Sequence, residues 1–191
     1  MEFSYFMPVR LLFGANVIDQ LGATAKSYGT HALIVTGRSS TKRSGLLDRS
    51  IALLEAAGVR ATVFNKVEPN PLTTTVMEGA ALAREQGCDL VIGMAVAFCA
   101  VNGGDVNDYI SGGKQGTGCL PILEVPTTCG TGSEANPFAV LTNPETKDKK
   151  SLWGDLIYPK VSFIDPELMK TMPKEVLASV GFDALSHNME G

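Results

Sequence analysis

The chain has 191 residues, of which 45% are hydrophobic and 19% are charged, as in an ordinary globular protein. Its formal net charge of −4 argues against a nucleic-acid-binding protein, which normally carries a basic excess. No apolar run reaches the roughly 18 residues that a membrane span needs, so we expect neither a nucleic-acid nor a membrane partner.

The first half of the chain alternates predicted strands and helices that are joined by short turns marked by glycine. Apolar runs rich in β-branched residues predict buried strands, and apolar residues spaced three and four apart predict helices. In chain order we predict a strand over 6–13, a helix over 17–28, a strand over 31–36, a polar loop over 37–44, a helix over 46–57, a strand over 61–64, a helix over 73–86 and a strand over 89–93. This alternation indicates an α/β domain with a Rossmann-like, mainly parallel sheet.

The alternation breaks directly after Gly93. Residues 95–101 (AVAFCAV) look like the end of a helix packed on a sheet, yet they follow the strand with almost no loop. Loops from a strand to a helix usually take about 2–6 residues. We therefore infer that a turn and the start of a helix are missing between Met94 and Ala95.

The second half adds further strands and one long helix. We predict strands over 120–125, 139–142 and 161–164, and a helix over 174–190 that Pro173 opens. Ligands of parallel sheets bind at the carboxyl ends of the strands. The candidate site is therefore formed by the loops after Thr36, Phe64 and Gly93, together with residues 126–134.

Two of these loops have a composition that suits a nucleotide. Residues 126–134 (PTTCGTGSE) combine glycines, which let backbone N–H groups approach an anion, with hydroxyl groups that suit a phosphate or ribose. The loop that begins at Gly37 carries no acid to bind the ribose hydroxyls, whereas Arg38 and its hydroxyl neighbours would accommodate a 2′-phosphate. A plain solvated turn is the alternative interpretation of each loop.

Asp183 and His187 lie four residues apart on the last predicted helix, so they project from the same face. A carboxylate and an imidazole at this spacing can share a divalent metal ion, although a simple surface pair is an open alternative. Two ligands do not make a firm site, and the only other histidine, His31, begins a strand far from this helix in the sequence. A metal would therefore need further ligands from elsewhere.

Taken together, these pieces resemble the iron-containing (group III) alcohol dehydrogenase family. The matching segments, which occur in the family's order and cover almost the whole chain, are 13–14, 67–71 (VEPNP), 89–93 (DLVIG), 102–109 (NGGDVNDY), 126–134 (PTTCGTGSE), 163–166 (FIDP) and 181–190 (GFDALSHNME). The resemblance implies an N-terminal α/β domain that binds NAD or NADP and an all-helical C-terminal domain that carries the metal. Residues 1–172 would form the first domain, and residues 173–191 would form only the first helix of the second.

The resemblance also implies individual site residues. Those assigned to the dinucleotide are Gly37, Ser39, Ser40, Thr41, Asn70, Thr127, Thr128, Thr131, Phe138 and Lys149. The family's metal, usually Fe²⁺ and in some relatives Zn²⁺, is held by an Asp and a His on one helix and by two later histidines, and Asp183 and His187 match the first two. Gly37 stands where NAD-preferring relatives often have Asp, so we expect NADP ahead of NAD. No residue is a candidate general base.

The chain departs from the family pattern at two places. Relatives continue from the strand at 89–93 into a glycine-rich segment of about ten residues whose helix N-terminus would face the pyrophosphate, and this segment is absent. The later histidines are absent as well, because the chain ends at Gly191. A real deletion, a designed or natural fragment, and a longer chain to which both segments belong are the possible explanations. We favour the longer chain, which predicts that the Cα atoms of Met94 and Ala95 lie farther apart than one peptide step of about 3.8 Å.

The resemblance implies hydride transfer between NAD(P) and a primary or secondary alcohol or aldehyde, with a divalent metal polarising the substrate oxygen. The expected protein is a homo-oligomer, a dimer or larger, that acts on a small molecule. Because none of its four cysteines forms a C-x-x-C pair and the N-terminus does not read as a signal peptide, we expect free thiols and a cytoplasmic location. Two alternatives remain open: a non-catalytic nucleotide-binding fragment, and an enzyme related to glycerol dehydrogenase or dehydroquinate synthase.

Overall fold

A six-stranded parallel sheet forms the centre of the computed structural model, which describes residues 2–110 and 113–190. The strand order is β1-β8-β5-β4-β2-β3, and every neighbouring pair is parallel. The strands are β1 (Arg10–Phe13), β2 (His31–Gly37), β3 (Arg60–Val67), β4 (Leu90–Ile92), β5 (Ile122–Glu124) and β8 (Val161–Ile164). The predicted α/β class with a Rossmann-like sheet is confirmed.

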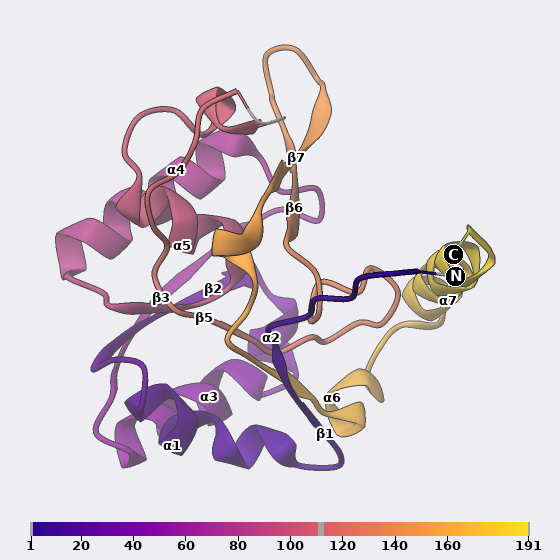
Figure 1. The fold of residues 1–191 in the computed structure, drawn as a ribbon. Coiled ribbons are helices and arrows are strands. Elements are labelled where there is room, and N and C mark those ends of the chain that lie inside the picture. The colour runs from indigo at the N-terminus through magenta and orange to yellow at the C-terminus, as the bar shows by residue number, and fades with distance from the viewer. Residues whose placement is uncertain (1, 111–112, 191) are drawn as a thin grey trace.

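Helices cover both faces of this sheet (Figure 1). The 3₁₀ helix η1 (Val17–Gln20), α1 (Leu21–Lys26) and α3 (Leu46–Ala56) pack on one face, and α4 (Thr73–Gln86) and α5 (Met94–Val101) pack on the other. A strand that is buried on both faces needs apolar residues at successive positions, which explains the unbroken apolar runs of β2 and β4. None of the helices in the described part of the chain is long and apolar enough to cross a membrane.

A second, antiparallel sheet of two strands lies over α5. It consists of β6 (Phe138–Thr142) and β7 (Lys149–Trp153), and its residues Leu141 and Leu152 belong to the same hydrophobic cluster as α4 and α5. The remaining elements are the 3₁₀ helices η2 (Val106–Asp108) and η4 (Asp155–Ile157), α6 (Pro166–Met169) and α7 (Lys174–Glu190). None of the described residues of α7 is buried, and this helix stands at the edge of the molecule (Figure 1).

Two local predictions need correction, and one strand was not predicted. The strand predicted over 6–13 is limited to Arg10–Phe13, where it pairs with β8. The polar loop predicted over 37–44 contains a short helix, α2 (Ser40–Arg43), in which the Arg43 amide donates to the Ser39 carbonyl at 2.9 Å. The strand β7 was not expected, because two of its first residues are lysines and only Leu152 is fully buried.

Met94 and Ala95 are consecutive residues of one helix, so the expected separation of their Cα atoms is not observed, whereas the missing segment of about ten residues stays a prediction. Both residues belong to α5, which begins immediately after β4 with Gly93 as its N-cap. Gly93 has φ 136° and ψ 144°, a conformation that only glycine adopts without strain. A Cβ atom at this position would lie 2.8 Å from the Cβ atom of Val35. One glycine therefore makes the abrupt turn that looked incomplete in the sequence.

Asp89 lies directly before β4 and connects the start of β4 to the start of β2. Its carboxylate accepts hydrogen bonds from the Thr30 amide at 2.9 Å, the Thr30 hydroxyl at 2.9 Å and the His31 amide at 2.8 Å. Burial opposes ionisation of this carboxyl, but the hydrogen bonds outweigh burial and lower the pKa of Asp89 below its ordinary value. The ionised form is therefore the form that the fold stabilises.

We expect Asp89→Asn to lower the free energy of unfolding by about 1–3 kcal/mol at neutral pH, because an amide accepts fewer of these hydrogen bonds. A carboxyl with a lowered pKa contributes stability above its unfolded pKa and loses it as the pH falls through its folded pKa. The difference in the free energy of unfolding between the wild type and Asp89→Asn should therefore become smaller in acid. Urea denaturation between pH 3 and pH 7 measures it, with Glu85→Gln on the exposed end of α4 as the control. A difference that stays constant over this range would contradict the assignment.

Candidate functional site

The carboxyl ends of β2, β3, β4 and β5 open into a group of adjoining cavities. The main cavity has a volume of about 630 Å³ and lies between these strand ends, the β6–β7 sheet and α7. A second cavity of about 470 Å³, the α2 cavity, lies between α2, the loop at 127–128 and the segment that joins α6 to α7. A third cavity of about 200 Å³ shares Val35 with the main cavity and shares Ser40, Thr41 and Thr127 with the α2 cavity.

Nearly all the predicted site residues line this group of cavities. The main cavity is lined by Asn70, Thr131, Phe138, Lys149, Asp183 and His187. The other two cavities are lined by Gly37, Ser40, Thr41, Thr127 and Thr128. Ser39 lines none of the three, and its hydroxyl accepts a hydrogen bond from the Arg43 guanidinium at 3.1 Å. The fold thus gathers residues from distant parts of the chain along one edge of the sheet.

The loop at 126–134 passes very close to α7. Gly130 has φ 152°, and a Cβ atom there would lie 2.6 Å from the Val180 carbonyl oxygen and 3.0 Å from Oδ2 of Asp183. The Gly130 carbonyl oxygen is 3.1 Å from Nδ1 of His187. The glycine at this point therefore permits the close approach of the loop to the two candidate metal ligands.

Asp183 and His187 could supply part of a metal site. Oδ1 of Asp183 and Nδ1 of His187 are 3.9 Å apart, and both side chains are about half exposed toward the main cavity. Because Nδ1 of His187 lies against the Gly130 carbonyl, Nε2 is the nitrogen left for a ligand. No cluster of three or more acidic, histidine or cysteine side chains that could hold a metal is found among residues 2–110 and 113–190. A carboxylate and an imidazole are ligand types that a divalent metal accepts, but together they fill only two of its coordination positions.

The arginine that faces the α2 cavity is not the predicted one. The Arg38 side chain is 73% exposed and its guanidinium lies 3.5 Å from the Glu68 carboxylate, outside the three cavities. Arg43, one helical turn further along, lines the α2 cavity with Ser40 and Ser44. In the main cavity, the Lys149 ammonium donates to Oδ1 of Asn70 at 3.2 Å. The α2 cavity therefore presents one arginine and the main cavity one lysine, whereas the third cavity has neither.

Glu124 is a cavity residue that was not predicted. It is the last residue of β5 and lines the main cavity. Burial, and after it the neighbouring Glu134 carboxylate, raises the pKa of the Glu124 carboxyl to about 8. The available signal in the sequence was an acidic residue inside the otherwise apolar strand segment LPILEV.

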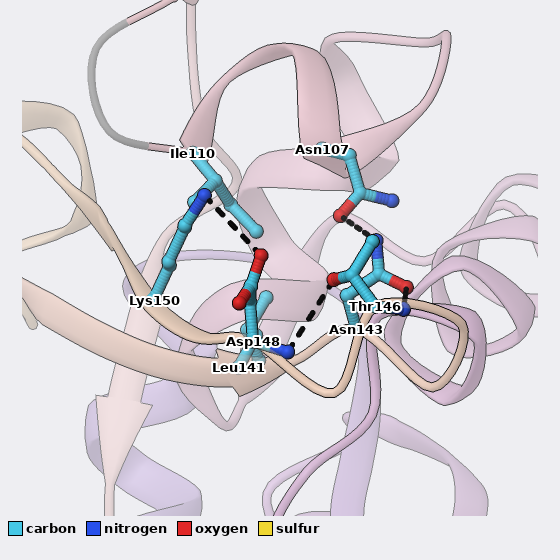
Figure 2. A pocket seen from close by; sticks show the side chains of 7 residues that line it. All are labelled: Asn107, Ile110, Leu141, Asn143, Thr146, Asp148 and Lys150. Atoms are coloured by element: carbon cyan, nitrogen blue, oxygen red, sulfur yellow. Dashed lines mark hydrogen bonds and ion pairs between the residues drawn. The ribbon is translucent and has the colours of Figure 1, made fainter.

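Another cavity, of about 200 Å³, lies away from the predicted residues. It sits between η2 and the β6–β7 turn (Figure 2). Asn143 donates to Asn107 at 3.2 Å on one side, and Lys150 pairs with Asp148 at 3.6 Å on the other. Its polar groups satisfy one another, so this cavity has the character of a packed turn rather than of a ligand site.

Comparison with families of known sequence gives a match over most of the chain. The model of the family described as "Iron-containing alcohol dehydrogenase" matches residues 8–166. Among curated proteins, the NADH-dependent butanol dehydrogenase A of Clostridium acetobutylicum is 35% identical over 200 aligned positions, which cover 100% of this chain and 51% of that protein. The chain therefore spans about half the length of this relative.

Solved structures show the same relationship. The NADH-dependent butanol dehydrogenase A of Thermotoga maritima superposes with a TM-score of 0.93 at 33% identity, covering 99% of this chain and 50% of that one. The sulfoacetaldehyde reductase of Bifidobacterium kashiwanohense, solved in complex with NAD⁺, superposes with a TM-score of 0.88 at 32% identity, covering 96% of this chain and 51% of that one. These neighbours share the α/β architecture described above.

Proposed function

The chain belongs to the iron-containing alcohol dehydrogenase family, and from this we propose that it is the dinucleotide-binding part of a metal-dependent NAD(P)-linked alcohol dehydrogenase. Such an enzyme transfers a hydride between the nicotinamide and a primary or secondary alcohol or aldehyde. One observation carries the proposal: residues from five separate segments line adjoining cavities at the carboxyl edge of the parallel sheet, next to Asp183 and His187. This edge is where α/β sheets bind nucleotides.

In this proposal the cofactor extends along the edge of the sheet. The adenosine half would occupy the α2 cavity, where Thr41, Thr127 and Thr128 offer hydroxyl groups beside the apolar side chains of Leu168 and Met172. The nicotinamide half would occupy the main cavity, where Asn70, Thr131 and Lys149 offer polar groups. We propose residues 1–172 as the dinucleotide-binding domain and residues 173–191 as the start of the helical metal-binding domain.

The metal would be held by Asp183 and His187 together with ligands beyond those described. A bound Fe²⁺, or alternatively Zn²⁺, would supply Lewis-acid polarisation of the substrate oxygen. The two side chains project into the cavity proposed for the nicotinamide, so an alcohol bound there would lie within reach of the cofactor. The close packing of Gly130 against α7 supports this arrangement, because it fixes the distance between the cofactor loop and the pair.

A binding titration tests the cofactor half of the proposal. We expect NADH and NADPH to bind the chain saturably, with quenching of intrinsic fluorescence or a heat signal that ADP-ribose competes away. An assay of NAD(P)H-dependent aldehyde reduction with added Fe²⁺ then separates an enzyme from the second candidate, a non-catalytic nucleotide-binding protein. The second candidate is favoured by one observation, the lack of a third metal ligand in the described residues. Absence of saturable dinucleotide binding would overturn both.

We further propose that NADP is accepted ahead of NAD, which differs from the NADH dependence stated in the names of the butanol dehydrogenases. Gly37 places no carboxylate at the end of β2, and Arg43 lines the α2 cavity where a 2′-phosphate would lie. Because a charge-assisted hydrogen bond contributes about 1.5–3 kcal/mol, Arg43→Ala should weaken NADPH binding by at least about tenfold and leave NADH binding nearly unchanged. Arg38→Ala is the matched control and should affect neither cofactor. Equal losses in the two variants would contradict the assignment.

Two further proposals concern the setting of the protein. The four cysteines are free, which supports a reducing, cytoplasmic location. Large apolar side chains at the N-terminal segment and along β1 are strongly exposed, including Phe3, Phe6 and Phe13. Exposed apolar groups next to the open edge of β1 support a homo-oligomer, a dimer or larger, and light scattering of the purified chain would measure its mass.

A further inference from the structure

Glu124 places an acidic group in the cavity that the proposed function assigns to a dinucleotide. It ends β5, one of the central strands of the sheet, and its neighbours across the cavity include Gly93, Met94 and Ala95. None of the hydrogen bonds or ion pairs found within residues 2–110 and 113–190 involves the Glu124 carboxyl. An acid without a partner group is therefore directed at the place where the pyrophosphate would lie.

The surroundings of Glu124 disfavour its charge. Glu124 is in register with Ser162 on β8, and the Ser162 hydroxyl donates to the Glu134 carbonyl at 2.6 Å, which holds the Glu134 segment beside the end of β5. The α5 residues at the cavity carry no charge. Three other titratable groups line the same cavity, namely Lys149 on β7 and the pair Asp183 and His187 on α7. Lys149 donates to Asn70 at 3.2 Å, and no ion pair among the described residues joins a cation to the Glu124 carboxyl.

We propose that Glu124 makes dinucleotide binding in the main cavity depend on pH. In the protonated state its carboxyl is neutral and can donate a hydrogen bond to a phosphate oxygen, and in the ionised state it repels the pyrophosphate. This inference rests on the proposed function, because it assumes that the cavity receives a dinucleotide. Glu124 would thereby distinguish ligands that carry phosphate from ligands that do not, because its ionisation would weaken only the binding of the former.

The expected size of the effect follows from the fraction of protein that is competent to bind. Burial, and after it the Glu134 carboxylate, raises the pKa of Glu124 to about 8, so that the carboxyl is mostly neutral at pH 6 and mostly ionised at pH 9. If only the neutral form binds, the apparent Kd equals the intrinsic Kd divided by the neutral fraction, and it rises about tenfold over this range. The apparent Kd should be nearly constant well below the pKa of Glu124 and should begin to rise near that pKa.

The experiment is a titration of the 191-residue chain with ADP-ribose at pH 6, 7, 8 and 9. The pyrophosphate diester of ADP-ribose keeps its charge over this range, so the ligand itself does not titrate. We expect the wild type to weaken about tenfold and Glu124→Gln, whose amide stays neutral, to retain nearly constant affinity. Glu55→Gln, an exposed residue of α3, is the matched control and should follow the wild type.

Adenosine provides a second comparison that needs no variant. Because it lacks phosphate, its binding to the wild type should be nearly independent of pH. A pH dependence that is the same for adenosine and ADP-ribose, or that persists in Glu124→Gln, would overturn the inference while leaving the proposed function intact. Failure of ADP-ribose to bind the folded wild type and Glu124→Gln at pH 6 would overturn the proposed function itself and the inference with it.

Discussion

Replacing Gly93 with alanine is expected to lower the free energy of unfolding by about 4 kcal/mol, which combines backbone strain with overpacking. The backbone at Gly93 has φ 136° and ψ 144°, and the added Cβ atom would lie 2.8 Å from the Cβ atom of Val35. Val35 belongs to β2, which pairs with β4 on one side and β3 on the other, so neither side of this contact can move freely. A thermal melt should show the midpoint reduced by about 10 °C for a chain of this size.

Gly154 offers a matched control for this substitution. Its φ of 142° and ψ of 162° are similar to those of Gly93, but no atom lies within 4 Å of the position that a Cβ atom would take. Gly154→Ala should therefore lose only the strain term of about 1–3 kcal/mol. Equal destabilisation by the two variants would show that the contact with Val35 contributes nothing. Because Gly93 also lines the main cavity, we expect Gly93→Ala to weaken dinucleotide binding, whereas Gly154→Ala should not.

We predict that the direct junction of β4 and α5 is the point at which this chain departs from the pattern of its family. The alignment with the butanol dehydrogenase extends over 200 positions although the chain has 191 residues, so it contains gaps in this chain. Their location at the junction after Met94 stays a prediction. A helix that begins at Met94 leaves no loop to surround a pyrophosphate, so the cavity at this point is closed by Gly93 and faced by Glu124. Both the glycine-specific backbone at Gly93 and the acid at Glu124 thus concern the same part of the proposed cofactor site.

Sequence patterns predicted the central sheet because its strands are buried on both faces. The short apolar runs HALIVT and DLVI favour buried strands, and α4 was predicted with its observed bounds Thr73–Gln86. The elements that were missed depend on tertiary contacts instead. Strand β7 starts with exposed lysines and is held by pairing with β6, and α2 consists of polar residues that no periodicity marks. Such elements carry too little local signal for prediction.

The candidate site was predictable in its composition and not in its geometry. The spacing of Asp183 and His187 indicates a shared helix face, but their position beside Gly130 depends on how the loop at 126–134 packs on α7. The difference between Arg38 and Arg43 depends on the α2 helix, which directs Arg43 toward the cavity and leaves Arg38 beside Glu68. The number of residues between Gly37 and an arginine does not determine in which direction the arginine side chain points.

The second large effect is expected for Gly22→Ala, at the contact between α1 and α3. A Cβ atom at Gly22 would lie 2.0 Å from the Leu53 carbonyl oxygen and 2.8 Å from the Leu53 carbonyl carbon. These are backbone atoms in the middle of α3, so the two helices must separate to admit a methyl group. We expect a loss of about 3 kcal/mol or more, read as a lower midpoint of urea denaturation without a large change in slope.

Gly181→Ala separates this packing effect from helix propensity. Gly181 also lies inside a helix, α7, but nothing lies within 4 Å of its Cβ position, so alanine there should stabilise the chain by up to about 1 kcal/mol. If both variants shifted the midpoint in the same direction, close packing at Gly22 would not be the cause. Because α3 follows directly on α2 and Gly45, a displaced α3 would also move Ser40 and Thr41 in the α2 cavity. We therefore expect Gly22→Ala to weaken adenosine binding at temperatures where the variant is still folded, and Gly181→Ala to leave it unchanged.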